Sequence, residues 1–272
     1  MATHVPRDCA IEALTDVWSR LDTVLGDLDD EEWATPTNLP GWTVQDVVAH
    51  VIGTEEMLRG NAPAAEIDRT RFPHVRNDIG AFNEQWVETM RADAPGTILQ
   101  RLRDVTAVRR RELAAMDAAR WDAEGFTPAG PDTYGRFMRI RVFDCWLHEQ
   151  DIRDAVGRPG GEDGPAAELA LDEMSVSMPY VVGKRAGAPA GSTVRFELTG
   201  ASARRIDVEV AERASLVEGL EGDPTVTLTM PAGVFARLGG GRIDPAVGRD
   251  QIDLLGDTDL GERIVANLAY TI

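Results

Sequence analysis

Two histidines and one aspartate, His50, Asp144 and His148, are the residues of this chain whose types and spacing best suit chemistry. Asp144 and His148 are four residues apart in a strongly helical segment, so their side chains share one face about one turn apart. His50 lies near the middle of another helical segment. Two imidazole nitrogens and one carboxylate converging between helices are three ligands of a divalent metal site with an open position. Such a position is where catalysis would take place.

Arg141 offers Asp144 a different partner. It lies one turn before Asp144 on the same helical stripe, and burying a carboxylate without a partner is costly. An Asp144–Arg141 ion pair would explain the aspartate without any metal, and a single helical histidine such as His148 is more often an ordinary core residue. We expect His4 to be disordered and His74 to lie in a surface loop that could line a cleft. The metal site and the ion pair remain alternatives at this point.

Helical periodicity in the first half supplies the elements that would position these side chains. T-V-Q-D at Thr43 is a capping-box pattern, and Gly157 followed by Pro159 ends the last helix. Several long helices with moderate loops fit a four-helix bundle, whose metal sites are built from inward-facing side chains; Trp42 and Trp146 would wall the pocket. We expect a loop at 122–132 and helices at about 7–28, 43–58, 77–91, 97–116 and 133–156, the third and fourth being separate or one broken helix.

The texture of the sequence changes after Gly157. A linker-like run, R-P-G-G-E-D-G-P, precedes one helix at about 166–180. From Gly191 the runs STVRFELTG, RRIDVEVAE and PTVTLTM alternate with the period of strands, and short helices follow near 232–238 and 260–268. We therefore predict a two-domain α+β protein, with a helix bundle at 1–157, a linker and connecting helix at 158–190, and a small α+β domain at 191–272 packed over the metal end of the bundle.

Composition and motifs argue against several classes of protein. The net charge of -18 argues against nucleic acid and anionic membranes as partners. We expect no transmembrane helix, since no apolar run reaches 18 residues, and no signal peptide at the N-terminus. Cys9 and Cys145 form no disulfide framework or C-x-x-C motif, which favours the cytoplasm. G-x-G-x-x-G, P-loop and G-x-S-x-G motifs are absent from the sequence.

Two helical motifs carry a family resemblance. L-P-G-W-T-V-Q-D-V-V-A-H at 39–50 and D-C-W-L-H-E-Q-D-I-R-D-A-V-G-R-P at 144–159 resemble the mycothiol-dependent maleylpyruvate isomerase family. G-D-P-T-V-T-L-T-M, followed by F-A-R-L, G-R and L-L-G-D, resembles the family's C-terminal domain. The resemblance covers nearly the whole chain and implies a DinB-like antiparallel four-helix bundle followed by a sterol-carrier-like α+β domain.

The resemblance also implies a ligand set and a cofactor. Zinc in the family is held by a histidine on the second helix and by a carboxylate and a histidine on the last bundle helix, which correspond to His50, Asp144 and His148. In the isomerase the carboxylate ligand is a glutamate. Asp144 has a shorter side chain, so a metal would lie closer to this helix. A divalent ion other than zinc is also possible at this site. Lys184 is the only lysine beside many arginines, a bias typical of GC-rich bacteria. This bias fits an actinobacterial source, and actinobacteria make mycothiol.

The function we expect is a metal-dependent mycothiol transferase or thiol-assisted isomerase that acts on a small electrophile. Asp151, one turn past His148, would orient that ligand. Arginines are needed to bind carboxylates of the thiol or substrate; the resemblance places one near Arg76, Arg242 of the second domain is another candidate, and Arg153 is a weaker one. A cleft between the domains would be the natural pocket.

Three other functions remain open. A metal-free module could carry a hydrophobic ligand in the sterol-carrier-like domain. A zinc hydrolase would use metal-bound water in place of a thiol. Two histidines and one carboxylate also suit non-haem iron(II). The expected partners are a small thiol and an electrophile, with no nucleic acid and no membrane, and the sequence gives neither the substrate nor the oligomeric state.

Overall fold

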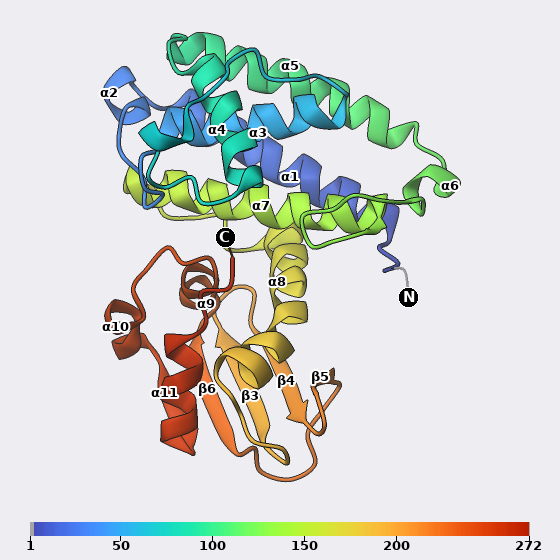
Figure 1. Ribbon diagram of the computed structural model, residues 1–272, viewed down its shortest axis with the longest axis vertical. Helices are drawn as coiled ribbons and strands as arrows, with labels where there is room; N and C mark the ends of the chain where they lie inside the picture. Colours follow the sequence, from blue (N-terminus) through green and yellow to red (C-terminus); the bar gives the residue numbers. More distant parts are fainter. Residues whose placement is uncertain (1–2, 272) are drawn as a thin grey trace. The chain divides into compact units, whose positions relative to one another are not determined.

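The computed structural model describes residues 3–271, and the chain divides into two compact units. The first unit ends at Gly161 and the second begins at Glu162. Figure 1 shows helices in the first unit and a sheet covered by helices in the second. The predicted fold class, a helix bundle followed by a smaller α+β unit, is confirmed.

The longest helices of unit 1 are α1, α3, α5 and α7, and Figure 1 labels each of them. Helix α1 packs against α5 and α7, α3 packs against the same two helices, and the shorter α4 packs against α3. The helices at 77–91 and 97–116 are separate, since the chain leaves the helix at Arg91 and starts a new one at Pro95. The five helices are α1 (Arg7–Gly26), α3 (Val44–Leu58), α4 (Asp78–Met90), α5 (Pro95–Ala114) and α7 (Tyr134–Ala155).

Side-chain caps fix where the helices of the candidate site begin. Thr43 caps α3 and forms the predicted capping box, since its hydroxyl accepts from Asp46 N and the Asp46 carboxylate accepts from Thr43 N. Thr133 caps α7 by accepting from Arg136 N. Gly157, with a φ of 64°, follows the end of α7, as expected of a left-handed C-terminal glycine. These boundaries set the register in which α3 and α7 present their inward faces.

Several short elements of unit 1 are not visible as periodic patterns. The prediction that 122–132 is wholly loop is wrong, because two-residue strands there pair with each other in an antiparallel hairpin. A two-residue ladder is too short to produce alternation of apolar and polar residues. The short elements are α2 (Asp30–Trp33), the 3₁₀ turn η1 (Arg69–Arg71), α6 (Ala118–Trp121), β1 (Glu124–Gly125) and β2 (Asp132–Thr133).

Unit 2 contains a five-stranded sheet in the order β5-β4-β3-β6-β7. The central β3 and β6 are parallel, and the other neighbouring strands are antiparallel. The three alternating runs of the sequence became β3, β4 and β6, whereas the edge strands β5 and β7 were missed because their side chains are mostly exposed. The strands are β3 (Thr193–Thr199), β4 (Arg204–Val210), β5 (Ala214–Val217), β6 (Val226–Pro231) and β7 (Asp253–Gly256).

Helices α8, α9 and α11 pack against this sheet. The helix that the sequence suggested as a connection between domains is α8, and it lies within unit 2, where its small side chains Ala166, Ala167 and Ala170 are fully buried. The helical elements of unit 2 are α8 (Gly164–Pro179), the π-helix η2 (Tyr180–Arg185), α9 (Ala232–Gly239), α10 (Pro245–Gly248), the 3₁₀ turn η3 (Arg249–Gln251) and α11 (Thr258–Ala266).

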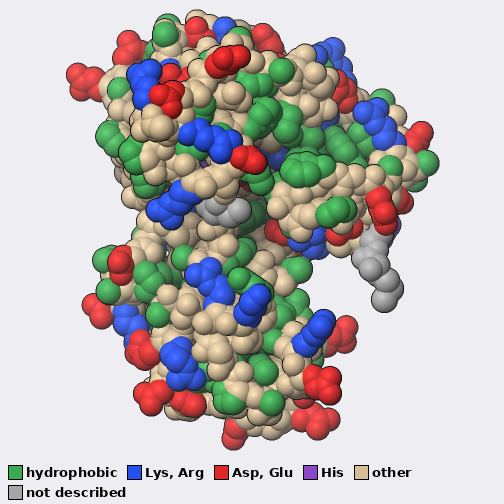
Figure 2. Space-filling model, viewed as in Figure 1, with side chains coloured by type: hydrophobic (Ala, Val, Ile, Leu, Met, Phe, Trp, Pro, Cys, Tyr) green, Lys and Arg blue, Asp and Glu red, His purple; other side chains and the backbone are tan. Residues whose placement is uncertain are grey.

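The described helices can be examined for hydropathy, and one face of the surface (Figure 2) can be examined for charge. Among the described residues, none of the helices combines the length and the hydropathy required to cross a membrane. On the face shown in Figure 2, acidic, basic and hydrophobic side chains are intermingled and do not gather by sign.

Candidate metal centre

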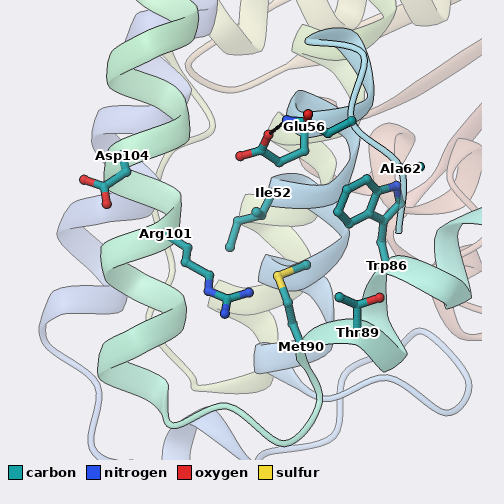
Figure 3. Close-up of a pocket in the computed structure, with 9 residues that line it drawn as sticks. Ile52, Glu56, Ala62, Trp86, Thr89, Met90, Arg101 and Asp104 are labelled. Atoms are coloured by element: carbon teal, nitrogen blue, oxygen red, sulfur yellow. Dashed lines mark hydrogen bonds between the residues drawn. The ribbon is translucent and has the colours of Figure 1, made fainter. Parts of the chain in front are cut away.

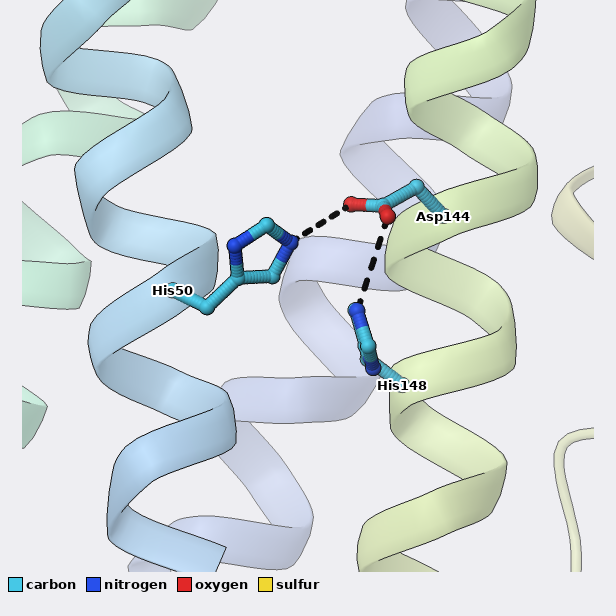
Figure 4. Close-up of side chains that lie close together, drawn as sticks. All are labelled: His50, Asp144 and His148. Atoms are coloured by element: carbon cyan, nitrogen blue, oxygen red, sulfur yellow. Dashed lines mark hydrogen bonds and ion pairs between the residues drawn. The ribbon is translucent and has the colours of Figure 1, made fainter. Parts of the chain in front are cut away.

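The three side chains singled out in the sequence meet between α3 and α7 (Figure 4). His50 comes from α3, and Asp144 and His148 come from adjacent turns of α7. His50 Nε2 lies 3.4 Å from Asp144 Oδ2, and His148 Nε2 lies 3.5 Å from Asp144 Oδ1. One ligand atom from each residue lies within 4.8 Å of the other two. The spacing of four residues thus brought Asp144 and His148 together, and the bundle added His50.

The distances between these atoms fit a divalent ion. Zinc with ligands at about 2.1 Å in tetrahedral geometry places neighbouring ligand atoms roughly 3.4 Å apart. The two nitrogen–oxygen separations have this size but involve different oxygens of Asp144; with one atom from each residue, all separations are within 4.8 Å. Both histidines are 5% exposed, whereas the Asp144 side chain is 30% exposed, so one side of the cluster is accessible. Two buried imidazoles and a partly accessible carboxylate are a suitable donor set for zinc with one position left for another ligand.

The charge states of the three side chains follow from burial and from each other. Burial lowers the pKa of His50, which favours the neutral form that a metal needs. Burial also opposes charge on His148, but Asp144 and Asp151 outweigh it and raise the His148 pKa. The pKa of Asp144 is well below its usual value despite burial, because Arg141 and the two histidines favour the carboxylate. The cluster therefore holds an anion that attracts either a proton or a cation.

Asp151 contacts His148 at the ring nitrogen that does not face Asp144. Its Oδ2 lies 2.9 Å from His148 Nδ1, and the residue is 1% exposed. A proton on Nδ1 shared with this carboxylate leaves Nε2 with its lone pair directed toward the cluster. His50 has no equivalent, since its Nδ1 is buried without a hydrogen-bond partner among the described residues. The His50 ring is instead held by packing.

Trp42 forms one wall of the cluster. Its ring centroid lies 5.3 Å from that of His50 and 6.4 Å from that of His148. The indole Nε1 donates to Glu84 Oε2 at 2.8 Å, which fixes the ring. Trp146 was expected to form a second wall, but its indole donates to the carbonyl of Gly161.

Glu84 is a residue of this wall that the sequence interpretation missed. It is fully buried and contacts Trp42, His74 at 2.8 Å and Arg91 at 2.7 Å. The contact with His74 ties the loop before α4 to the wall, so this histidine has a structural partner. Ala81 and Val87, three residues before and after Glu84, are buried, and this helical spacing was the available signal.

Arg141 pairs with Asp144, and the same aspartate also lies beside both histidines, so the ion pair does not separate the three candidate ligands. Its Nη1 donates to Asp144 Oδ2, the oxygen that also faces His50. The same guanidinium donates from Nε and Nη2 to Glu55 Oε1 at 3.1 Å and 2.8 Å. The sequence interpretation missed Glu55. It lies on α3 one turn after Val51 and Ile52, which are buried, and a carboxylate is unusual on such an apolar face.

The three predicted arginines are not part of this cluster. Arg76 is exposed, in the loop between η1 and α4. Arg153 donates to Glu149 Oε1 at 2.7 Å near the end of α7. Arg242 belongs to unit 2, where its Nη1 donates to the carbonyl of Gly240. The loop of Arg76 nevertheless reaches the site's wall through His74.

A hollow of about 520 Å³ opens on another part of unit 1 (Figure 3). It lies between α3, α4 and α5, and none of the three cluster residues lines it. Apolar and charged side chains share its wall, among them Ile52, Glu56, Trp86, Met90, Arg101 and Asp104. This hollow is separate from the proposed metal centre.

The fold and the cluster define a class of protein: a helix bundle with an interior His–Asp–His site, joined to a small α+β unit. Residues 14–153 match the sequence model of the mycothiol maleylpyruvate isomerase N-terminal domain, and residues 168–263 match that of the MDMPI C-terminal domain. The chain belongs to the mycothiol maleylpyruvate isomerase family, a family of enzymes.

Solved structures share the fold of this chain, and two curated proteins share part of its sequence. A crystal structure of the mycothiol-dependent maleylpyruvate isomerase is 17% identical, covers 92% of this chain and 93% of its own, and gives a TM-score of 0.59. A histidine-to-alanine mutant of that isomerase gives a TM-score of 0.57 at the same identity and coverage. Two uncharacterised Mycobacterium tuberculosis proteins are each 27% identical over 141 residues, which is 50% of this chain and 52% of each relative. The chain thus spans about half the length of the curated relatives it matches.

Proposed function

We propose that this protein is a zinc-dependent enzyme that uses mycothiol as a thiol cosubstrate and acts on a small electrophile. The observation that carries the proposal is the His50–Asp144–His148 cluster, whose ligand atoms all lie within 4.8 Å of one another. Family membership supports the thiol and the isomerase class, since the solved relatives are named mycothiol-dependent maleylpyruvate isomerases. The electrophile itself is open, and maleylpyruvate is one candidate.

The residues in and around the cluster would have different roles in metal binding and catalysis. His50, Asp144 and His148 would hold the metal, and bound zinc would supply a Lewis acid that keeps a thiol deprotonated near neutral pH. Asp151 would keep the Nδ1 proton of His148 in place, so that Nε2 remains a ligand. Trp42 would shield the two imidazoles from water on one side.

The overall reaction needs no further cofactor. The thiol sulfur adds to the electrophilic carbon, and a proton goes to the neighbouring atom. In an isomerase the adduct rotates about the new single bond and then loses the thiol, whereas in a transferase the conjugate leaves as product. Carboxylates on the thiol or on the substrate would be bound by cations of the protein.

Arg76 and Arg242 are the proposed cations. Arg76 is exposed on a loop tied to Trp42 through His74 and Glu84, so its side chain can meet an anionic ligand. Replacing Arg76 by alanine should raise the KM for thiol or substrate and leave the metal content unchanged. Arg71→Ala, at an exposed arginine in the same segment, is the matched control. Equal KM values for the two variants would remove Arg76 from the proposal.

The cellular setting follows from the same proposal. Mycothiol is a thiol of actinobacteria, and both curated relatives come from Mycobacterium tuberculosis. We propose the cytoplasm as the compartment, where a low-molecular-weight thiol remains reduced.

The direct test is titration of metal-loaded protein with mycothiol and, separately, with glutathione. Calorimetry should detect binding of mycothiol, and conjugate or isomer formation should follow with a suitable electrophile. Asp144→Glu should retain some metal because the family uses glutamate at this position. Metal analysis of the purified wild-type protein comes first. Absence of heat and of product with every thiol would end the thiol proposal even if zinc is present, and turnover without thiol would favour a hydrolase.

A further inference from the structure

The guanidinium of Arg141 occupies an unusual place beside the proposed metal ligands. Its side chain is 3% exposed and is bonded to Asp144 Oδ2. Two further N–H groups donate to Glu55, and Nη2 also lies 3.3 Å from Cys145 Sγ. A permanent cation is thus fixed next to the carboxylate that would hold another cation.

Glu55 fixes Arg141 through a second buried arginine. Glu55 is 1% exposed; its Oε1 accepts from Arg141, and its Oε2 accepts from Arg109 Nε at 3.0 Å. Arg109 is anchored further by Tyr134, whose hydroxyl lies 2.8 Å from Nη2. Each oxygen of Glu55 therefore serves a different arginine, and only one of the two arginines reaches the metal ligands.

We propose that Arg141 is an internal counter-ion of the metal centre, which keeps the site folded without metal and lowers its affinity for metal. The inference rests on the proposed zinc site. Without an ion, Asp144 would be a partly shielded anion beside two buried imidazoles, and leaving a charge unpaired in such a place is destabilising. Arg141 supplies the missing partner. When a divalent cation binds, the Arg141 guanidinium repels it and competes with it for Asp144 Oδ2.

Two opposing effects decide the direction of the change in affinity. Arg141 helps a metal by holding the Asp144 side chain in one rotamer, but an aspartate has only two side-chain torsions to restrict. It opposes a metal by repulsion between a buried monocation and a dication a few ångströms apart, where screening by water is weak. Repulsion is the larger effect, so removing the guanidinium should tighten metal binding.

The experiment compares Arg141→Met with Arg109→Met in the full chain. Both variants remove one buried guanidinium from Glu55, but only the first removes a charge from Asp144. Affinity is measured with Co²⁺ by its visible absorption and with Zn²⁺ by competition; thermal unfolding is followed with metal and with chelator. We expect Arg141→Met to bind metal about tenfold more tightly, a change of about 1.4 kcal/mol, and Arg109→Met to stay within about twofold of wild type.

Stability and a second variant keep the test decisive if Arg141→Met folds poorly. Relative to wild type, the melting temperature of Arg141→Met should fall more in the presence of chelator than in the presence of zinc. An Arg141→Met variant that folds only with zinc also supports the proposal. Glu55→Gln removes the anion that balances Arg141 while preserving shape, so its metal affinity should fall about tenfold. Glu55→Gln that binds metal as well as wild type, or better, would overturn the proposal.

The outcomes separate this inference from the proposed function. A wild-type chain that binds neither Co²⁺ nor Zn²⁺ overturns the zinc-dependent function, and the inference with it. Wild type that binds metal, with equal affinities in Arg141→Met and Arg109→Met, overturns the inference alone.

Discussion

The interiors of the two units differ in what they bury. The core of unit 1 contains charged or titratable side chains at many described positions, among them Asp46, His50, Glu55, Glu84, Arg109, Arg136, Arg141, His148, Glu149 and Asp151. In the described part of unit 2, the buried polar residues are Glu173, Ser192, Ser202 and Asp207. Burying charge is costly unless each group has a partner, so the bundle depends on pairing these groups with one another.

The way each unit neutralises its buried acids sharpens the contrast. Asp207 in unit 2 is held by both ends of one guanidinium, since Arg195 donates from Nε and Nη2 at 2.8 Å and 2.9 Å across paired strands. This pair is closed, with two donors for two oxygens. Asp144 in unit 1 faces one arginine and two histidines, so its neutralisation leaves room for a further cation. Asp207 therefore has one partner that satisfies both oxygens, whereas Asp144 is shared among three side chains.

The largest effect that would sharpen this contrast is expected from His148→Ala. Two ligands remain after this change, and two rarely hold zinc tightly, so the metal affinity should fall more than about a hundredfold and activity should disappear with it. The measurement is Co²⁺ absorption together with metal analysis after dialysis.

His4→Ala is the matched control for this prediction, because the His4 side chain is 78% exposed and lies outside the cluster. It should bind metal as wild type does. Retention of full metal affinity in His148→Ala would show that the buried charges of unit 1 do not form a metal centre.

A substitution in the core of unit 2 should show the opposite profile. Phe196 is fully buried, and its ring centroid lies 5.9 Å from that of Phe235. Phe196→Ala removes a large apolar side chain and should destabilise unit 2 by about 3–5 kcal/mol. Denaturant unfolding measures the loss, and Co²⁺ titration of the folded variant should give the wild-type affinity. A metal affinity that falls with stability would show that the difference between the two interiors does not separate chemistry from packing.

The smallest effect concerns the two cysteines and requires no mutation. Burial raises the pKa of Cys145 to about 12, and the residue is fully buried, whereas Cys9 is exposed. At pH 8 only about one Cys145 side chain in ten thousand would be a thiolate, so alkylation should stop at one group per native chain. Mass spectrometry of peptides should find the label on Cys9, and on both cysteines in denaturant. Rapid labelling of native Cys145 would show that the interior beside Asp144 opens to solvent.

The sequence alone predicted most features of this molecule that depend on neighbouring residues. Apolar residues that recur at helical spacing, together with the cap at Thr43, predicted the long helices, because both patterns depend only on neighbouring residues. The pair Asp144 and His148 was visible for the same reason, since a spacing of four residues fixes one helix face. Family-specific motifs added His50. Edge strands β5 and β7 and the short hairpin at Asp132 were not visible, because brief, exposed elements have no periodic pattern.

Tertiary structure decided which distant side chains share a partner. The sequence posed a metal site and an Asp144–Arg141 pair as alternatives. Packing of α3 on α7 brought His50 to Asp144 and left the Arg141 pair in place, with Glu55, 86 positions from Arg141 in the chain, holding the guanidinium. Glu84 likewise joins Trp42 to His74 only after α4 folds against α3. A side chain's type and local spacing determine which atoms it can offer. Only the three-dimensional packing determines which charges meet in an environment from which water is excluded, and there the energy of each pairing is large.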